Sequence, residues 1–304
     1  MNVLAYVMLG FAPGAFWLWL IYQRDRYIPA PPFLVVRTFL WGVAVSLPVV
    51  IVEALLEAVG GVTLGGGLPG DSSVARIAYG AFVVAGFTEE AAKFLVVRRT
   101  VYPSPYFRHS LDGVIFAAAS ALGFASIENV FYMAEFGPAV ILVRGPFSTL
   151  AHVFFSVAWG YALGQQKQAG RGRRVAAALL AAMFLHGLFD FLLFLADPQY
   201  AAWAFVLFAA AAVVFIILIG RARRESPFRN KVAVVLASCP ACGYLGWGSA
   251  RYCTACGAPA LARPSKAKQT GPFACGSCRQ PILPAHHFCT SCGSRLDRRK
   301  PLVL

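Results

Sequence analysis

The sequence predicts an all-α polytopic membrane protein with about seven transmembrane helices, followed by two small zinc-ribbon modules. Of its 304 residues, 59% are hydrophobic and only 13% are charged, and the mean hydropathy is +0.65. Such a composition excludes an ordinary soluble globular domain. The apolar residues gather in runs long enough to cross a bilayer, and all eight cysteines follow the last of these runs. We therefore expect a membrane part followed by a small metal-binding part.

Seven apolar segments reach or approach the roughly 18 residues that identify a transmembrane helix. The first has no basic residue before it and no small-residue cleavage site after it, so we expect a retained helix and not a signal peptide. The last ends near residue 220, which predicts a membrane domain at 1–220 and a basic cytosolic linker at 221–238. The segments are approximately 2–22, 33–59, 74–97, 111–134, 146–164, 175–196 and 200–220.

Charges in the connections between these segments predict the orientation. The connections after the first, third, fifth and seventh segments carry fourteen Lys and Arg residues, whereas those at 60–73, 135–138 and 197–199 carry none. By the positive-inside rule, the N-terminus lies outside and the C-terminus lies in the cytosol. Arg76 and Arg144 are exceptions near the outer boundary, and we interpret both as side chains that reach the outer lipid headgroups.

The cysteines form the most specific motif of the chain. Each set of four reads Cys-x2-Cys, ten residues, Cys-x2-Cys, and the second set repeats the first 36 residues later. Two such pairs supply the four thiolates of a structural zinc site, and a reducing cytosol disfavours disulfides. Gly243, Gly257 and Gly293, each after the second cysteine of a pair, suit a tight turn. We predict ribbons at 239–257 and 275–293, a linker at 258–274 and a basic tail at 294–304, with two zinc ions held by Cys239, Cys242, Cys253, Cys256, Cys275, Cys278, Cys289 and Cys292.

The tail is basic, which raises the question of nucleic-acid binding. Beyond Lys231 there are nine basic residues and one acidic residue, Asp297, a formal charge of +8. A zinc ion bound by four thiolates carries a local charge of about −2, so two sites leave about +4. Nucleic acid is therefore disfavoured as a partner. A solvated or membrane-adjacent surface, with a protein partner for the ribbons, fits better.

Ionisable residues inside the apolar segments are the candidate functional site. Burying such a side chain at membrane depth costs on the order of 3 kcal/mol unless it is paired or faces an aqueous cavity. Glu89 and Glu90 are adjacent in the third segment, and Lys93 follows one turn later, where it can pair with either. The candidate catalytic residues are Glu89, Glu90, Lys93, Glu128, His152, His186 and Asp190.

Spacing predicts which of these groups act together. His186 and Asp190 are four residues apart and share one helix face, an arrangement by which a carboxylate fixes an imidazole tautomer. Counted from the predicted inner helix ends, Glu90, His152 and His186 lie roughly 10 to 18 Å deep and can meet. Glu128 is expected to lie farther out. Acids and imidazoles on four segments favour an active site over isolated helix–helix contacts.

These residues form an ordered series of motifs that resembles the PrsW intramembrane proteases. The series is Glu89-Glu90-x-x-Lys93, Phe124-x-x-x-Glu128-Asn129, Arg144-Gly-Pro followed by His152-x-x-x-Ser156 and Gly160-Tyr161-x-x-Gly164, and His186-x-x-x-Asp190. It covers about residues 1–220, and the family is similar in turn to the wider CPBP group that contains CAAX-prenyl endopeptidases. The zinc-ribbon tail lies outside the shared region.

The resemblance implies a multi-pass protein of the bacterial inner membrane that cleaves a membrane protein substrate, such as a single-pass anti-sigma factor. It further implies that Glu89 and Glu90 are the catalytic pair, that Glu128, His152 and His186 complete the site, and that Asp190 supports His186. Arg144 also matches the family pattern, which favours a structural or functional role for it over a lipid-facing one.

The chemistry stays open between two forms of amide hydrolysis. In one, Glu89 or Glu90 takes a proton from water while histidine stabilises the oxyanion. In the other, Glu89 or Glu90 together with Glu128, His152 and His186 holds a zinc ion that activates the water. Two other functions also stay open. One is a CAAX-type membrane hydrolase, and the other is a non-enzymatic membrane sensor or scaffold that acts through the ribbons.

Overall fold

The chain divides into two compact units, Met1–Arg224 and Glu225–Leu304, and each is considered by itself. The structure is a computed structural model. It describes residues 2–25, 27–62, 73–169 and 173–228, and in the second unit residues 239, 241–242, 252–253, 255–259, 273–278, 281–282, 287–289, 292–296 and 302–303.

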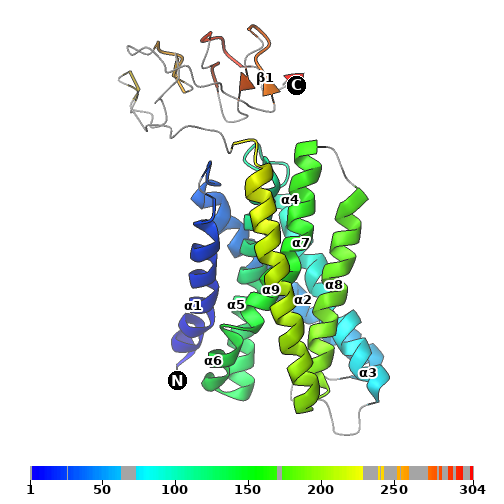
Figure 1. The fold of residues 1–304 in the computed structure, drawn as a ribbon. Coiled ribbons are helices and arrows are strands. Elements are labelled where there is room, and N and C mark those ends of the chain that lie inside the picture. The colour runs from blue at the N-terminus through cyan, green and yellow to red at the C-terminus, as the bar shows by residue number, and fades with distance from the viewer. Residues whose placement is uncertain are drawn as a thin grey trace. The chain divides into compact units, whose positions relative to one another are not determined.

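The first unit is a helical bundle (Figure 1). Asn2 accepts a hydrogen bond from the backbone of Ala5 and so begins the first helix, and Pro32 occupies the first position of the second. The elements are α1 (Val3–Tyr22), α2 (Pro32–Gly60), α3 (Val74–Tyr79), the π-helix η1 (Gly80–Phe87), α4 (Thr88–Thr100), α5 (Ser110–Phe136), the 3₁₀ turn η2 (Pro138–Val140), α6 (Ile141–Arg144), α7 (Ser148–Ala169), α8 (Arg173–Phe194) and α9 (Pro198–Glu225).

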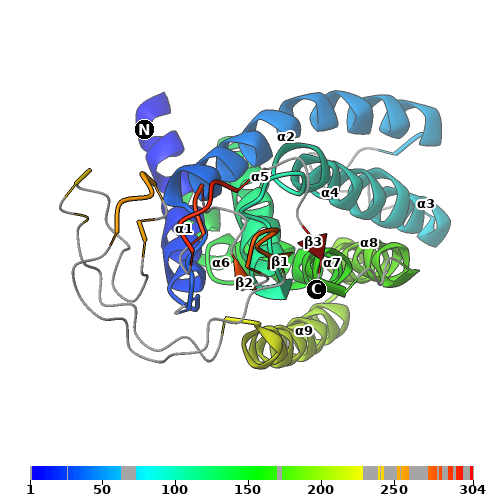
Figure 2. The same cartoon turned by 90° about the horizontal axis from the view of Figure 1, so that it is seen from above.

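Helix α5 forms the centre of the bundle, with α1, α2, α4 and α7 packed around it (Figure 2). In an apolar 18-residue stretch of α5, 78% of the residues are buried, against 17% in the corresponding stretches of α1 and α2. Small residues permit this close packing, because a side chain on Gly113 would collide with the backbone of α7 at Gly160. Helix α9 packs against α7 through larger side chains, with Phe154 in contact with the rings of Phe208 and Phe215.

The apolar segments predicted from the sequence are helical in the structure. Among the described residues, five helices are long and apolar enough to cross a membrane, and the bent pair Pro138–Arg144 and Ser148–Gln168 makes a sixth. The third predicted segment, 74–97, is helical from Val74 to Thr100, but it contains the π-helix η1 and carries five charged residues after it, in α4. The chain is therefore a multi-pass membrane protein, and its described residues include five or six strongly apolar spans and one charged helical segment that contains η1.

The second unit contains two small cysteine-centred modules with the same local structure. An isolated bridge pairs Tyr252 with Pro259 in the first module, and its equivalent 36 residues later pairs Phe288 with Arg295. The second module also forms a three-stranded sheet in the order β2-β1-β3, with strands β1 (Phe273–Ala274), β2 (Pro281–Ile282) and β3 (Leu302–Val303).

The two modules contact each other in a reciprocal manner. Gly257 and Gly293 both adopt positive φ, +78° and +74°, as expected for the turn after a cysteine pair. Each glycine lies under an aromatic ring of the other module. A Cβ built on Gly293 would be 2.9 Å from the ring of Tyr252, and one on Gly257 would be 3.1 Å from the ring of Phe288. Gly243, the third predicted turn residue, lies outside the described residues.

Candidate active site

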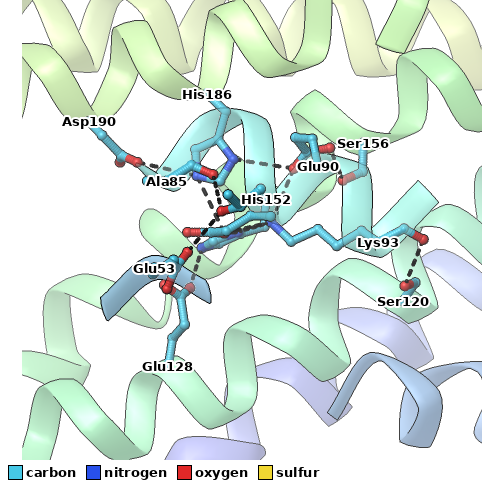
Figure 3. Close-up of polar contacts among 12 residues, drawn as sticks. Glu53, Ala85, Glu90, Lys93, Ser120, Glu128, His152, Ser156, His186 and Asp190 are labelled. Atoms are coloured by element: carbon cyan, nitrogen blue, oxygen red, sulfur yellow. Dashed lines mark hydrogen bonds and ion pairs between the residues drawn. The ribbon is translucent and has the colours of Figure 1, made fainter. Parts of the chain in front are cut away.

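The predicted catalytic residues come together inside the helical bundle. Figure 3 labels all of them except Glu89. The two adjacent glutamates lie in the first turn of α4, and the two histidines project from α7 and α8. The imidazole rings of His152 and His186 meet edge to face, with 5.0 Å between their centroids. Glu90 and Lys93 are fully buried, and Glu89 is 4% exposed. The site is therefore held by helices and not by loops, which favours precise geometry.

Glu90 has four hydrogen-bond partners. Its Oε2 accepts from the Ser156 hydroxyl at 2.8 Å and from the Trp159 indole N–H at 3.0 Å. Its Oε1 lies 3.1 Å from Lys93 Nζ and 3.3 Å from His186 Nδ1. A carboxylate so fully engaged has little capacity for a reacting water. The geometry is that of a group that positions its neighbours.

Glu89 is placed differently, between the two histidines. Its Oε2 lies 3.5 Å from His152 Nδ1 and 3.8 Å from His186 Nε2. The three side chains each offer one ligand atom, all within 4.8 Å of one another. Two ligands of a tetrahedral metal ion, each about 2.1 Å from it, are about 3.4 Å apart. A carboxylate and two imidazoles at these separations therefore suit a divalent ion such as zinc.

The other nitrogen of each imidazole faces a carboxylate. His152 Nε2 lies 2.8 Å from Glu128 Oε2, and His186 Nδ1 faces Glu90. Each ring thus presents its remaining nitrogen toward Glu89. A ligating histidine is commonly oriented by a carboxylate on its second nitrogen, so the surroundings of the two rings also fit a metal site. Asp190 lies 3.4 Å from His186 Nε2, on the Glu89 side of the ring.

Lys93 bridges the glutamates and one histidine. Its Nζ is 2.9 Å from Glu89 Oε2, 3.1 Å from Glu90 Oε1 and 2.8 Å from His152 Nδ1. It also lies over the ring of Phe124, 4.5 Å from the centroid. The predicted choice of either glutamate is therefore resolved, because Lys93 contacts both at once.

Arg144 does not extend to lipid headgroups, so the interpretation from its position in the chain was wrong; its side chain lies inside the bundle, in line with the role that the PrsW-like pattern favoured. Its side chain is buried, donates from Nε to Asn129 Oδ1 at 3.0 Å, and lies 3.4 Å from Glu128 Oε2. Its guanidinium also lies 3.6 Å from the centroid of the Tyr132 ring. The cost of desolvating an arginine near the bilayer interior is offset by these partners. Arg144 thereby fixes the carboxylate that orients His152.

Glu128 lies at the level of His152, whereas the sequence placed it farther out. Helix α7 continues to Ala169, five residues beyond the predicted end at 164. His152 consequently lies 17 residues from that inner end, and Glu128 lies 18 residues from the start of α5 at Ser110. The expected difference in depth arose because the polar residues 165–168 gave no sign that the helix continues to Ala169.

The π-helix η1 and the glycines beside it bring α4 and α8 together. A Cβ on Gly86 would lie 2.6 Å from Met183 O and 2.7 Å from Gly187 N, and one on Gly187 would lie 2.8 Å from Phe82 Cα. The backbones of η1 and α8 can therefore approach this closely only because both positions are glycine. Because Gly187 follows His186 directly and η1 ends just before Glu89, this contact sets the distance between imidazole and carboxylate. Short π-helical segments are frequent at functional sites.

A cavity of about 370 Å³ opens beside this cluster. Glu89, Glu128, His152, His186 and Asp190 line it, whereas Glu90 and Lys93 do not. Its lining continues to residues near the ends of α2, α5 and α8, at the end of the bundle that the charge pattern predicts to be extracytoplasmic. Water therefore has a route from that end to Glu89.

Comparison with known proteins gives the family. A model of the PrsW family intramembrane metalloproteases matches residues 30–220. The chain belongs to this family. It is similar to Protease PrsW of Geobacillus kaustophilus, with 34% identity over 189 residues, 62% of this chain and 79% of that protein. Protease PrsW of Bacillus subtilis is 30% identical over 192 residues, 62% of this chain and 83% of that protein. No solved structure matches the chain.

The family match confirms the resemblance and leaves the cysteine tail outside it, as the sequence predicted. The word metalloprotease in the family description agrees with the donor set around Glu89. The two residues of α7 that donate to Glu90, Ser156 and Trp159, were not among the predicted catalytic residues. Ser156 did belong to the quoted PrsW-like pattern, but hydrogen bonding across helices cannot be inferred from spacing.

Sequence reasoning also missed Glu53. This residue of α2 lines the cavity, and Thr88 donates a hydrogen bond to its Oε1 at 3.2 Å. The rule that an acid inside an apolar segment is a functional candidate applies to Glu53 as much as to Glu89. Glu53 lies in the apolar segment 33–59, so its position in the sequence was itself the signal that could have identified it.

The cysteines of the PrsW-family chain form two further metal-suited groups. In the first, Sγ separations are 3.8 Å for Cys239–Cys256 and 3.8 Å for Cys242–Cys253. In the second they are 3.8 Å and 3.6 Å. Thiolates about 2.3 Å from a tetrahedral zinc ion are about 3.8 Å apart, and all eight cysteines are free of disulfides. The four cysteines of each repeat thus lie together, as the sequence predicted.

Local hydrogen bonds favour the thiolate form in both groups. Burial raises the pKa of the Cys253 thiol, but backbone N–H donors of Cys256 and Ala255 outweigh it and lower the pKa to about 7. For Cys275, burial again raises the pKa, and the Ser294 hydroxyl with the backbone of Cys278 lowers it to about 6. Thiolate is the metal-binding form of cysteine, so both knuckles are prepared for a cation near neutral pH.

Proposed function

We propose that this chain is an intramembrane endopeptidase in which Glu89 acts on the attacking water, while Glu90 and Lys93 position the site. The observation that carries the assignment is the difference between the two glutamates. Glu89 lines the cavity between two imidazoles, whereas Glu90 is fully buried and engaged by four donors. Among the described residues, the hydrogen bond and ion pairs of Glu89 use Oε2. Its Oε1 is the atom that we assign to accept the proton.

Glu89, His152 and His186 would hold the catalytic metal ion. The ion would polarise the substrate carbonyl and activate the water. Glu128 and Glu90 keep the outer nitrogen of each histidine protonated, so that the inner nitrogens remain available. Four carboxylates, those of Glu89, Glu90, Glu128 and Asp190, face two cations, Lys93 and Arg144. A divalent ion suits this excess of negative charge.

The proposed reaction is hydrolysis of one peptide bond. Water in the cavity loses a proton to Glu89 Oε1 as its oxygen bonds to the carbonyl carbon. The carbon–nitrogen bond then breaks, and Glu89 returns the proton to the leaving nitrogen. General acid–base assistance of this kind contributes typically 10² to 10⁴-fold to a rate. The surrounding helices exclude bulk water from the remaining faces.

The substrate class follows from the setting of the cavity. It opens toward the helix ends that the charge pattern predicts to lie outside, so the scissile bond would lie in the outer half of a membrane protein, such as a single-pass anti-sigma factor. We propose a bacterial inner membrane location, with the N-terminus outside and the ribbons in the cytosol. In a tail-deleted background, a cysteine introduced at Ser72 should react with an impermeant thiol reagent in intact cells, and one at Ser104 should not.

The test of the activity is a comparison of membrane proteomes from cells that express the wild type and Glu89→Gln. A single-pass protein should accumulate uncleaved in the variant. Glu135→Gln, which alters another acid on the cavity wall, is the matched control and should cleave normally. Normal processing by Glu89→Gln would refute the assignment, and a prenylated accumulating protein would indicate a CAAX-type hydrolase instead.

We propose that each cysteine group binds one structural zinc ion and that the ribbons contact a protein partner. The thiolate separations support the metal. The absence of the ribbons from the family match separates them from the hydrolytic chemistry. Deletion of the tail should leave cleavage intact but change which substrate is cleaved or when. Full loss of cleavage in a tail deletion that still folds would favour a sensor or scaffold that acts through the ribbons.

A further inference from the structure

Lys93 occupies the same place in the site that a metal ion requires. Its Nζ lies 2.9 Å from Glu89 Oε2 and 2.8 Å from His152 Nδ1. Glu89, His152 and His186 each offer one ligand atom to the buried Glu/His group, and Glu89 Oε2 faces one nitrogen of each histidine, at 3.5 and 3.8 Å. The ammonium therefore already contacts two of the three donors that a metal would use.

The geometry leaves no room for both cations at these distances. Glu89 Oε2 and His152 Nδ1 are 3.5 Å apart. An ion about 2.1 Å from each of them would lie at most about 3.4 Å from an ammonium nitrogen that contacts both. Lys93 is fully buried, so solvent does little to screen a divalent ion from a positive charge this close.

We propose that Lys93 and the metal ion are alternative occupants of the Glu89–His152–His186 donor set. Metal binding then requires the ammonium to withdraw from Glu89 and His152. This inference rests on the metal-assisted form of the proposed function. It makes Lys93 a positioning residue that sets the affinity of the site for metal, with no contact to substrate.

Lys93 has partners that it can keep when the metal binds. Glu90 Oε1 lies 3.1 Å from its Nζ, and the Phe124 ring centroid lies 4.5 Å away. Glu90 is itself anchored by Ser156 and Trp159. The adjacent glutamates thus have separate partners, Glu89 for the metal and Glu90 for the lysine. This division gives a physical reason for two consecutive carboxylates in an apolar segment.

The test is a Co²⁺ titration of the full chain in nanodiscs, with the ribbons loaded with zinc. Cobalt at a carboxylate–imidazole site gives visible d–d bands without the near-ultraviolet bands of thiolate ligands, so the two kinds of site are separable. Lys93→Met should bind Co²⁺ at least tenfold more tightly than the wild type, because the competing charge is gone. Glu89→Gln should lose the visible bands. Equal or weaker binding by Lys93→Met would overturn the proposal.

A second variant covers the case in which Lys93→Met does not fold. Lys93→Arg keeps the positive charge in a larger, planar group, and it should bind Co²⁺ more weakly than the wild type. Equal or tighter binding would overturn the proposal. If no variant shows the visible bands while the wild type still cleaves substrate in chelator, this inference fails and the peptidase stands. If Co²⁺ competition is observed without cleavage, the proposed activity fails and the competition stands.

Discussion

Exchange of each glutamate for glutamine should separate a reacting group from a positioning group. In Glu90→Gln, the amide keeps one acceptor oxygen and replaces the other by a donor. If the donor takes the place of Oε2 it meets the Trp159 N–H, and if it takes the place of Oε1 it meets the Lys93 ammonium. Either orientation leaves a buried donor without its acceptor.

The magnitude follows from these contacts. A buried donor left unsatisfied costs about 1 to 3 kcal/mol, and loss of one partner of a buried ion pair costs about 3 to 5 kcal/mol. Because Lys93 keeps Glu89, we expect a total loss near the lower value, about 3 kcal/mol, for Glu90→Gln. Glu89→Gln should cost about 1 kcal/mol or less, since Lys93 keeps Glu90 and the amide oxygen remains an acceptor.

The assay pairs unfolding with cleavage. Chemical unfolding in detergent, followed by tryptophan fluorescence, gives the free energy of unfolding, and cleavage of the substrate found by proteomics gives the rate. Glu89→Gln should fold normally and lose at least about 10²-fold in rate. Glu90→Gln should unfold more easily. If Glu90→Gln is as stable as the wild type while Glu89→Gln is strongly destabilised, the roles are reversed and the reasoning from hydrogen bonds is wrong.

Three further predictions concern packing, pH and the ribbons. Gly187→Ala should separate η1 from α8 and reduce the rate of cleavage by about 10²-fold, because displacements near 1 Å have such effects. The control is Gly220→Ala, where a Cβ meets only the tip of Arg224 at 4.0 Å, and this variant should cleave normally. Equal rates for both variants would refute the packing argument. Burial and the nearby Asp112 raise the pKa of Asp25 to about 7, so the folded state holds this proton more tightly than the unfolded chain, and stability should fall as pH rises from about 4 to 7. Asp25→Asn should therefore be more stable than the wild type at pH 8 by up to about 4 kcal/mol, but not at pH 4. A difference in unfolding free energy that does not depend on pH would contradict the raised pKa. In the ribbons, the ring of Tyr252 lies on Gly293 and so couples the two modules. Chelator should therefore remove both zinc ions in one step from the wild type and in two steps from Tyr252→Ala. Two steps for the wild type in a colorimetric zinc-release assay would exclude coupling between the modules.

The part of the site that lies along one helix could be read from the sequence. Lys93 three and four residues after two acids must reach them, and His186 and Asp190 four residues apart must share a face. The cysteine repeat likewise fixed which thiols could share an ion, since a 36-residue period and two-residue spacers leave one sensible grouping. Helix identity was equally local, because apolar length alone decides it.

Contacts between helices needed the tertiary structure. The burial of Arg144 against Glu128, the hydrogen bond from Trp159 to Glu90 and the cavity position of Glu53 all depend on helix ends and on rotation of one helix against another. The rotation of one helix against another is set by a few close contacts, such as that of Gly86 with Gly187, and such contacts cannot be recognised from the sequence alone.

The sequence by itself therefore determined that this is a multi-pass membrane protein with a buried acid–histidine set and two four-cysteine groups. Hydrophobic length, charge asymmetry and short-range spacing are properties of the chain alone. Only the tertiary structure decided that Glu89 faces the cavity while Glu90 is held by Ser156 and Trp159. Two neighbouring glutamates are chemically identical in sequence, and they differ only through the side chains that packing places around each of them.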